Sequence, residues 1–179
     1  MKTFQTLNLR RNNFIYKPNP PYKIMAKEKA TFGAGCFWHI ELEFSKLQGV
    51  LKAESGYMGG KAMSKVTYEQ VCSNTTGHAE VVQVTFDNKK ISYSELLKTF
   101  WKIHNPTTLN RQGMDIGTQY RSVIFYHNEK QKTQAKNSLK EHQKTLSEKI
   151  LTKIVKASKF HKAEEYHQKY LLKRGRNTC

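Results

Sequence analysis

The chain has 179 residues and a formal net charge of +17, from 31 lysine and arginine residues against 14 acidic ones. This length suits a single domain with its own hydrophobic core, so folding needs no disulfide framework. The three cysteines form no CxxC pair and lack zinc-finger spacing, which excludes a secreted disulfide scaffold and a zinc finger. No apolar run is long enough to span a membrane. We therefore expect a cytoplasmic protein with at least one reactive thiol.

The positive charges are spread along the chain, as lysines scattered through apparent helices and loops. Between Glu129 and Lys149, six lysines stand against three glutamates. A clustered basic face would indicate a nucleic-acid interface, whereas scattered lysines are typical of a solvated surface. We therefore expect neither a specific nucleic-acid partner nor a membrane partner.

The first 24 residues differ from the rest of the chain. They contain no acidic residue, several Lys, Arg and Asn, and no continuous apolar core of the kind found in secretory signals. Met25 is a second methionine at which translation can begin. We interpret residues 1–24 either as an organelle-targeting segment or as the result of an upstream start codon. In both cases we expect them to be mostly disordered and the folded domain to span 25–179.

The first half of the domain predicts strands on both sides of one helix. Apolar residues recur at helical spacing from Phe37 to Leu47, whereas AEVVQVTF alternates, with Glu80, Val82 and Phe86 on one face. The predicted elements are a strand at 29–35, a helix from residue 36, a strand at 49–60, a helical turn at 68–71 within a loop, and a strand at 79–86.

The second half repeats this order with additional elements. Ser92 and Glu95 have the spacing of a capping box, which marks the start of a helix. The predicted elements are a helix from this cap to residue 104, a long loop at 105–120, a strand at 121–127, a polar helix at 129–147, a last strand at 150–156, a helix at 162–174 and a loose tail at 175–179. Two βαβ units indicate an α+β fold, a two-layer sandwich with a ferredoxin-like, split βαβ core.

Cys36 stands between a glycine pair and two aromatic residues, where a helix begins. The thiolate is the reactive form of cysteine, and a helix N-terminus lowers the pKa of a thiol through its dipole and free N–H groups. Gly33 and Gly35 permit a tight turn that exposes the sulfur, and Phe37 and Trp38 are placed to wall an apolar pocket. A buried cysteine with core aromatics is the alternative.

Four polar residues stand in loops or at the edges of elements: Tyr68, Glu80, Asp115 and Tyr120. A carboxyl group near an apolar pocket keeps its proton more readily, and phenol hydroxyls can hydrogen-bond a substrate oxygen. Each residue alone is a weak signal, since a carboxyl group at a strand edge is usually solvated and a loop tyrosine usually packs.

The motifs GAGCFWHIE, GYMGG, TYEQVCSNTTGHAEVVQV, FWKIHNPTTLNRQGMDIGTQYRSVIFY and AEEYHQKYL occur in this order over residues 28–179. Together they resemble the peptide methionine sulfoxide reductases of the A type. The loop before Tyr68 lacks the Asn-Pro that many members have there, so its path is expected to differ.

The resemblance implies a catalytic role for each matching residue. Cys36 would attack the sulfoxide sulfur and become a sulfenic acid. Glu80 would donate a proton to the oxygen, and Tyr68 and Tyr120 would hold that oxygen. Asp115 is associated with the same site.

The resemblance also implies how the substrate binds and how the enzyme is recycled. Phe37 and Trp38 would receive the methyl group of the substrate. Cys179, in the C-terminal tail, would resolve the sulfenic acid as a disulfide that thioredoxin reduces, whereas Cys72 is expected to pack rather than react. The substrate would be free methionine sulfoxide or oxidised proteins, with no cofactor and with a monomeric enzyme.

Two other classes of protein stay open at this stage. A cysteine hydrolase or acyl transferase would need His78 or His104 within hydrogen-bond reach of Cys36. A basic nucleic-acid-binding domain would bind with steep salt dependence and would survive the loss of Cys36.

Overall fold

The computed structural model describes residues 27–177, so the predicted N-terminal extension 1–24 and Cys179 lie outside the described residues. The main sheet has the strand order β7-β6-β1-β3-β2-β8, and a separate two-stranded hairpin is formed by β4 and β5. The strands are β1 (Lys27–Gly33), β2 (Val50–Met58), β3 (Ala79–Asp87), β4 (Arg111–Gln112), β5 (Asp115–Ile116), β6 (Val123–Tyr126), β7 (Lys153–Lys156) and β8 (His161–Lys162). The helices are α1 (Phe37–Ser45), α2 (Tyr68–Cys72), α3 (Tyr93–Lys102), α4 (Glu129–Gln143) and α5 (Tyr170–Lys173).

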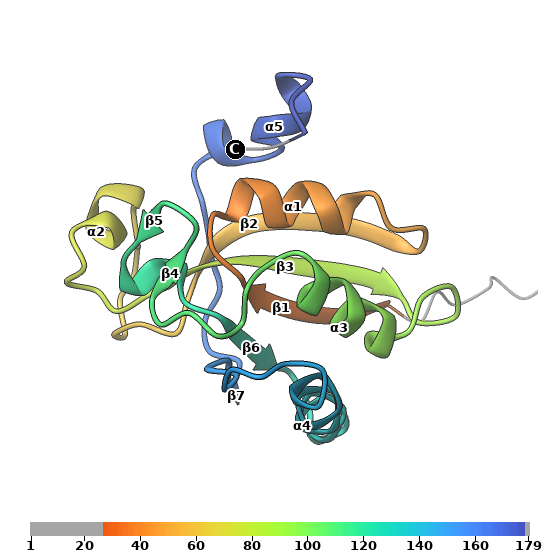
Figure 1. Ribbon diagram of the computed structural model, residues 1–179. Coiled ribbons are helices and arrows are strands. Elements are labelled where there is room, and N and C mark those ends of the chain that lie inside the picture. The colour runs from red at the N-terminus through yellow and green to blue at the C-terminus, as the bar shows by residue number, and fades with distance from the viewer. Residues whose placement is uncertain (1–26, 178–179) are drawn as a thin grey trace, which may run out of the picture.

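The predicted split βαβ core is confirmed. Its elements follow the chain as β1-α1-β2-β3-α3-β6, and the four strands lie in the order β6-β1-β3-β2 with antiparallel neighbours. At one edge α4 connects β6 to the parallel strand β7, and β8 pairs with β2 at the other. Figure 1 shows α1, α3 and α4 along the same side of the sheet, which leaves a two-layer arrangement.

The core forms between these helices and the sheet. Val82, Val84 and Phe86 alternate along β3 with no exposed surface, and they belong to the same apolar cluster as Phe32 of β1 and Phe100 of α3. Each buried side chain of this size contributes about 1.5–3 kcal/mol relative to exposure. The alternating apolar residues predicted for β3 therefore pack the sheet against its helices.

The opposite face of the sheet is covered by the segment that follows β7. Phe160 packs there beside Phe125 and Met58. A Cβ atom at Gly56 would overlap the ring of Phe160, so only glycine permits this approach.

Hydrogen bonds at the helix starts explain two boundaries. The predicted capping box is confirmed: Ser92 accepts the N–H of Glu95, whose carboxylate accepts the N–H of Ser92. Thr67 and Gln70 form a second capping box, which defines the short helix α2.

Three predictions for the second half of the chain were wrong in detail. The polar helix ends at Gln143 rather than 147, because the segment after it folds over the Gln143 side chain, whose amide group donates to the carbonyl oxygens of Leu146 and Glu148. The 105–120 loop contains the β4–β5 hairpin and a 3-10 turn at Thr118–Tyr120. The strand β7 is not the last, since β8 follows it.

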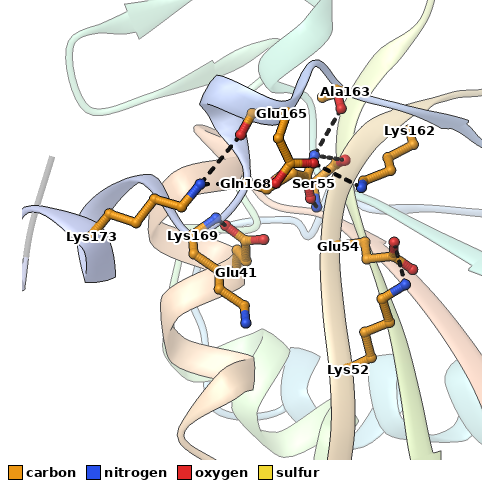
Figure 2. Close-up of polar contacts among 10 residues, drawn as sticks. All are labelled: Glu41, Lys52, Glu54, Ser55, Lys162, Ala163, Glu165, Gln168, Lys169 and Lys173. Atoms are coloured by element: carbon orange, nitrogen blue, oxygen red, sulfur yellow. Dashed lines mark hydrogen bonds and ion pairs between the residues drawn. The ribbon is translucent and has the colours of Figure 1, made fainter.

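The helix predicted at 162–174 is also wrong. The segment forms a 3-10 turn at Glu165–His167, then a left-handed residue, Lys169, with φ of 53°, and only then α5. The N–H of Lys169 donates to the Glu41 carboxylate of α1 at 2.6 Å, instead of continuing a helix. Tertiary hydrogen bonds, drawn in Figure 2, thus override a helical sequence pattern.

Candidate active site

Cys36 is the N-cap residue of α1, directly after the turn that ends β1. Gly35 has a φ of 93°, a conformation that favours glycine. A Cβ atom at Gly33 would lie 2.8 Å from Val123 and 2.9 Å from the carbonyl oxygen of Glu80, so β1 approaches β3 and β6 closely here. The predicted tight turn is confirmed, and it leaves Cys36 half-buried rather than enclosed in the core.

Glu80 lies at the start of β3, beside this turn, and is 2% exposed. Its carboxylate accepts the backbone N–H of Phe37, the residue after Cys36, at 3.1 Å. On the other side of β3, Glu80 pairs in register with Tyr57 of β2. The sheet therefore places one buried carboxyl group at the N-terminus of α1.

Tyr120 joins these groups from the 3-10 turn that follows β5. Burial and the negative charges of Glu80 and Asp115 raise the pKa of Tyr120 above its ordinary value. The charge of Cys36 acts in the same direction. This phenol therefore remains a neutral donor near neutral pH and lies close to Cys36, Glu80 and Asp115.

Tyr68 comes from the first turn of α2. Burial, a hydrogen bond with the Cys72 side chain and the charge of Glu80 raise the pKa of its hydroxyl. Tyr120 also acts on the pKa of Tyr68, and Glu80 and Cys72 act on the pKa of both phenols, so the two tyrosines lie near the same groups. Figure 1 shows that α2 and the β4–β5 hairpin lie together at the end of the sheet where α1 begins.

Cys72 lies at this site, although only a packing role was expected for it. Its thiol is half-buried and interacts with the Tyr68 hydroxyl. Burial raises the pKa of the Cys72 thiol, although its hydrogen bond with Tyr68 acts in the opposite direction. A thiol that holds its proton is a poor nucleophile, so this position favours packing and hydrogen bonding over attack.

The two aromatic residues after Cys36 differ in exposure. Phe37 is 1% exposed and packs against Tyr57, with 5.8 Å between ring centroids. Trp38 is half-buried, and its indole stacks on Tyr170 at 3.8 Å and 7°. The structure therefore places Trp38 at the surface of the site and Phe37 beneath it.

Sequence reasoning missed the residues of the AEEYHQKYL segment that reach this site. Glu164 accepts the Tyr57 hydroxyl at 2.9 Å and the backbone N–H of Tyr68 at 3.0 Å. Burial opposes its charge, but these hydrogen bonds hold the pKa of Glu164 below its ordinary value. No periodicity could have indicated this role, because the partners are about 100 residues apart in the chain.

The histidines considered as bases for Cys36 are engaged elsewhere. Both ring nitrogens of His104 lie 2.7 Å from other partners, the carbonyl oxygen of Phe100 and the Ser122 hydroxyl, and burial lowers the pKa of His104 to about 4. His78 packs against Gly60 and lies edge-on to His161. A cysteine hydrolase with either base is therefore not supported. Within residues 27–177, no cluster of three His, Cys, Asp or Glu residues could hold a metal ion.

The site combines a half-buried cysteine at a helix start with a buried carboxyl group and two neutral phenols. This combination is typical of a thiol-dependent enzyme whose substrate carries an oxygen that accepts hydrogen bonds. The family model described as "Peptide methionine sulfoxide reductase" matches residues 28–179, and the chain belongs to this family. A relative in Geobacter sulfurreducens named "Peptide methionine sulfoxide reductase MsrA" is 57% identical over 154 residues, covering 85% of this chain and 94% of the relative. A relative with the same name in Methanothermobacter thermautotrophicus is 54% identical, with 85% and 90% coverage.

Solved structures agree with this assignment. Reduced Mxr1 from Saccharomyces cerevisiae is similar with a TM-score of 0.81 and 37% identity, covering 86% of this chain and 88% of that one. Methionine sulfoxide reductase A of Corynebacterium diphtheriae has a TM-score of 0.81 and 31% identity, with 90% and 85% coverage. No helix within residues 27–177 is long and apolar enough to cross a membrane.

Proposed function

We propose that this protein reduces methionine S-sulfoxide, free and in proteins, to methionine, and that it repairs proteins after oxidative damage. The observation that carries the proposal is the buried Glu80 carboxyl group bonded to the residue after Cys36. Membership of the reductase family supports the reaction class.

The first step transfers the sulfoxide oxygen to the enzyme. The Cys36 thiolate attacks the sulfoxide sulfur while Glu80 donates its proton to the oxygen, which makes the sulfur more electrophilic. The attack forms a bond between the Cys36 sulfur and the substrate sulfur. The protonated oxygen then passes to the Cys36 sulfur as the substrate's sulfur–oxygen bond and the new sulfur–sulfur bond break, so that methionine leaves with two electrons gained and Cys36 becomes a sulfenic acid with two electrons lost. Tyr68 and Tyr120 donate hydrogen bonds to the oxygen during this transfer.

Separate positions for acid and nucleophile make the step feasible near neutral pH. Glu80 is 2% exposed, and burial disfavours charge on a carboxyl group. Cys36 is the N-cap residue of α1, where the helix dipole favours a thiolate. The two groups can therefore hold opposite protonation states, as the reaction requires.

The second step regenerates Cys36. The Cys179 thiol attacks the sulfenic acid, a disulfide forms, and water leaves. Thioredoxin then reduces the disulfide by thiol exchange. A solved structure of Mxr1 in complex with Trx2, with a TM-score of 0.59 and 27% identity to this chain, supports thioredoxin as the reductant.

Cys179→Ser separates the two steps. We expect the first step to survive, with about one methionine formed per enzyme molecule, because Cys36 alone accepts the oxygen. Thioredoxin-supported turnover should fall by roughly tenfold or more, whereas dithiothreitol should restore activity by attacking the sulfenic acid directly. The measurement is methionine release with each reductant.

Cys72→Ser is the matched control, since it removes a thiol near the site and keeps a hydroxyl beside Tyr68. It should leave thioredoxin-supported turnover intact. Mass spectrometry of the oxidised parent should show Cys36 linked to Cys179. A Cys36–Cys72 link, with unimpaired thioredoxin turnover in Cys179→Ser, would make Cys72 the resolving residue.

For location and assembly we propose a cytoplasmic monomer. The alternative is targeting to an organelle by residues 1–24, which lack acidic residues. A relative in Arabidopsis thaliana is named "Peptide methionine sulfoxide reductase A4, chloroplastic". Expression of the full chain and of the chain from Met25, each fused to a fluorescent protein, distinguishes the two.

A further inference from the structure

We infer that a pocket beside the active site binds an acidic side chain, Asp or Glu, that lies a few residues from methionine sulfoxide in a protein substrate. The positive charges of this pocket come from Arg121, Lys153 and Lys156, and we call it the cationic pocket. The inference rests on the proposed function, because it concerns how oxidised proteins are selected for that reaction.

The cationic pocket has a volume of about 620 Å³, which is large enough for the side chains of a few residues. Its three basic side chains face no acid within it, since none of the described residues that line the pocket is acidic. The side chains of β6 that line it, Val123 and Phe125, are apolar and buried. This lining favours an anionic ligand over a neutral or cationic one.

Arg121 is a partly buried charge without a counter-charge. Its guanidinium donates to the carbonyl oxygens of Thr118 at 2.8 Å and of Gly77 at 3.1 Å, which occupy N–H groups but carry no net charge. Among residues 27–177, no acidic side chain forms an ion pair with Arg121. Burial accordingly lowers the pKa of Arg121. Since charges withdrawn from water are ordinarily paired, a carboxylate from a substrate would supply the missing partner.

The two lysines of the cationic pocket are also available to a ligand. Lys153 and Lys156 are exposed, and neither forms an ion pair with an acidic side chain of the described residues. Lysines elsewhere are occupied, as in α4, where Lys132 and Lys144 pair with glutamates three positions earlier. The parallel pairing of β7 with β6 fixes both ends of the lysine pair beside the strand that follows Arg121.

The turn after β2 closes the cationic pocket on one side. Gly59 has a φ of 82°, and a Cβ atom there would lie 2.5 Å from the ring of Phe125 and 3.3 Å from Nη2 of Arg121. Glycine therefore allows the backbone to approach the guanidinium closely. An arginine held between this turn and two carbonyl oxygens loses little side-chain freedom when it binds an anion.

The cationic pocket and the active site are built from the same backbone segments. Thr118 lines the pocket and opens the 3-10 turn that ends at Tyr120, while Gly77 lines it three positions before Glu80. Asn74, two positions after α2, also lines the pocket, and its side-chain oxygen accepts the Thr118 hydroxyl at 3.1 Å. A peptide whose sulfoxide lies at Glu80 and Tyr120 therefore has its neighbouring residues beside the pocket.

Position in the peptide distinguishes this pocket from the general charge of the protein. A net charge of +17 attracts any acidic peptide, wherever its acid lies. A pocket instead accepts an acid only at certain distances from the sulfoxide. Because an extended chain advances about 3.3 Å per residue, we expect the preferred acid roughly two to five residues away, on one side only.

The test uses peptides with one methionine S-sulfoxide and one glutamate, placed at successive positions before and after it, and matched peptides with glutamine. At positions that reach the pocket, glutamate should raise kcat/KM by roughly 5- to 30-fold, as expected for hydrogen bonds to a charged group that stays partly exposed. Lys153→Gln/Lys156→Gln should lose most of this advantage. The control Lys136→Gln/Lys140→Gln, which removes two exposed charges from α4, should keep it. Free methionine S-sulfoxide should be reduced equally by all three proteins.

An equal advantage at every position, or an equal loss in both double variants, would show general attraction to a basic surface and overturn the inference. A phosphoserine peptide that is more than about tenfold better than the glutamate peptide would overturn it too, in favour of a phosphate site. Fluorescence anisotropy of the labelled glutamate peptide on Cys36→Ser measures binding without turnover, and the lysine substitutions should weaken it. A parent that does not reduce free methionine S-sulfoxide would contradict the proposed function, whereas the binding result tests the cationic pocket by itself.

Discussion

Replacement of Cys36 by serine should abolish reduction of methionine sulfoxide. A serine hydroxyl holds its proton near neutral pH even at a helix N-terminus, so the variant lacks the anion that attacks the sulfoxide sulfur. Loss of a covalent nucleophile typically lowers kcat by on the order of 10⁴–10⁶-fold. The measurement is methionine formation with dithiothreitol as reductant, which makes the result independent of the resolving cysteine.

The fold of this variant should be intact, because Cys36 is half-buried and serine has a similar size. Circular dichroism and the midpoint of thermal unfolding check this point. Cys72→Ser, treated identically, controls for loss of a thiol near the site. If Cys36→Ser retains more than a few per cent of parental activity, the nucleophile has been assigned to the wrong residue.

Glu80→Gln should slow the reductase step by roughly 10²- to 10⁴-fold, the usual contribution of general acid catalysis. Glutamine keeps the shape of the side chain and an oxygen that can accept the N–H of Phe37. It cannot donate an acidic proton to the sulfoxide oxygen. Substrate affinity should change much less than the rate. Single-turnover kinetics, with methionine quantified over time, measure this step without regeneration.

Glu54→Gln is a suitable control, because Glu54 is a carboxylate on the neighbouring strand β2 that forms an ion pair with Lys52. It removes one negative charge and leaves the proposed acid in place. Its rate should match that of the parent. A single-turnover rate for Glu80→Gln within about threefold of the parent would show that the proton comes from another group.

The sequence predicted the elements whose stability depends on local patterns. The alternating residues of β3 and the capping box of Ser92 and Glu95 encode their own structure, so the split βαβ core followed from them. The turn at Gly35 was also predictable, because few residues other than glycine adopt its conformation. These elements bring Cys36 and Glu80 together.

The C-terminal segment could not be predicted in this way. Its sequence is compatible with a helix, and the outcome depends on bonds from Gln168 and Lys169 to β2 and α1, which lie more than 100 positions away. The same applies to Glu164, which accepts the Tyr57 hydroxyl, and to His167, which accepts the indole N–H of Trp38. Their partners are fixed only when the segment docks, so no spacing in the sequence indicates their roles.

The position of Cys72 is another example. Its helical turn was predicted, but its proximity to the proposed catalytic groups depends on how α2 packs beside the start of β3. Local sequence determines that such a turn forms, but it does not determine which residues the turn contacts.

A single-turnover experiment with the separate epimers of methionine sulfoxide, without reductant, probes the proposed mechanism at its first step. A chiral sulfur places its methyl group against Trp38 and its oxygen toward Glu80 in only one of the two configurations. We predict about one methionine per enzyme molecule from the S epimer, with Cys36 recovered as a sulfenic acid or in a disulfide with Cys179, and almost none from the R epimer. Comparable methionine from the R epimer, or turnover of the S epimer with Cys36 unmodified, would contradict the mechanism.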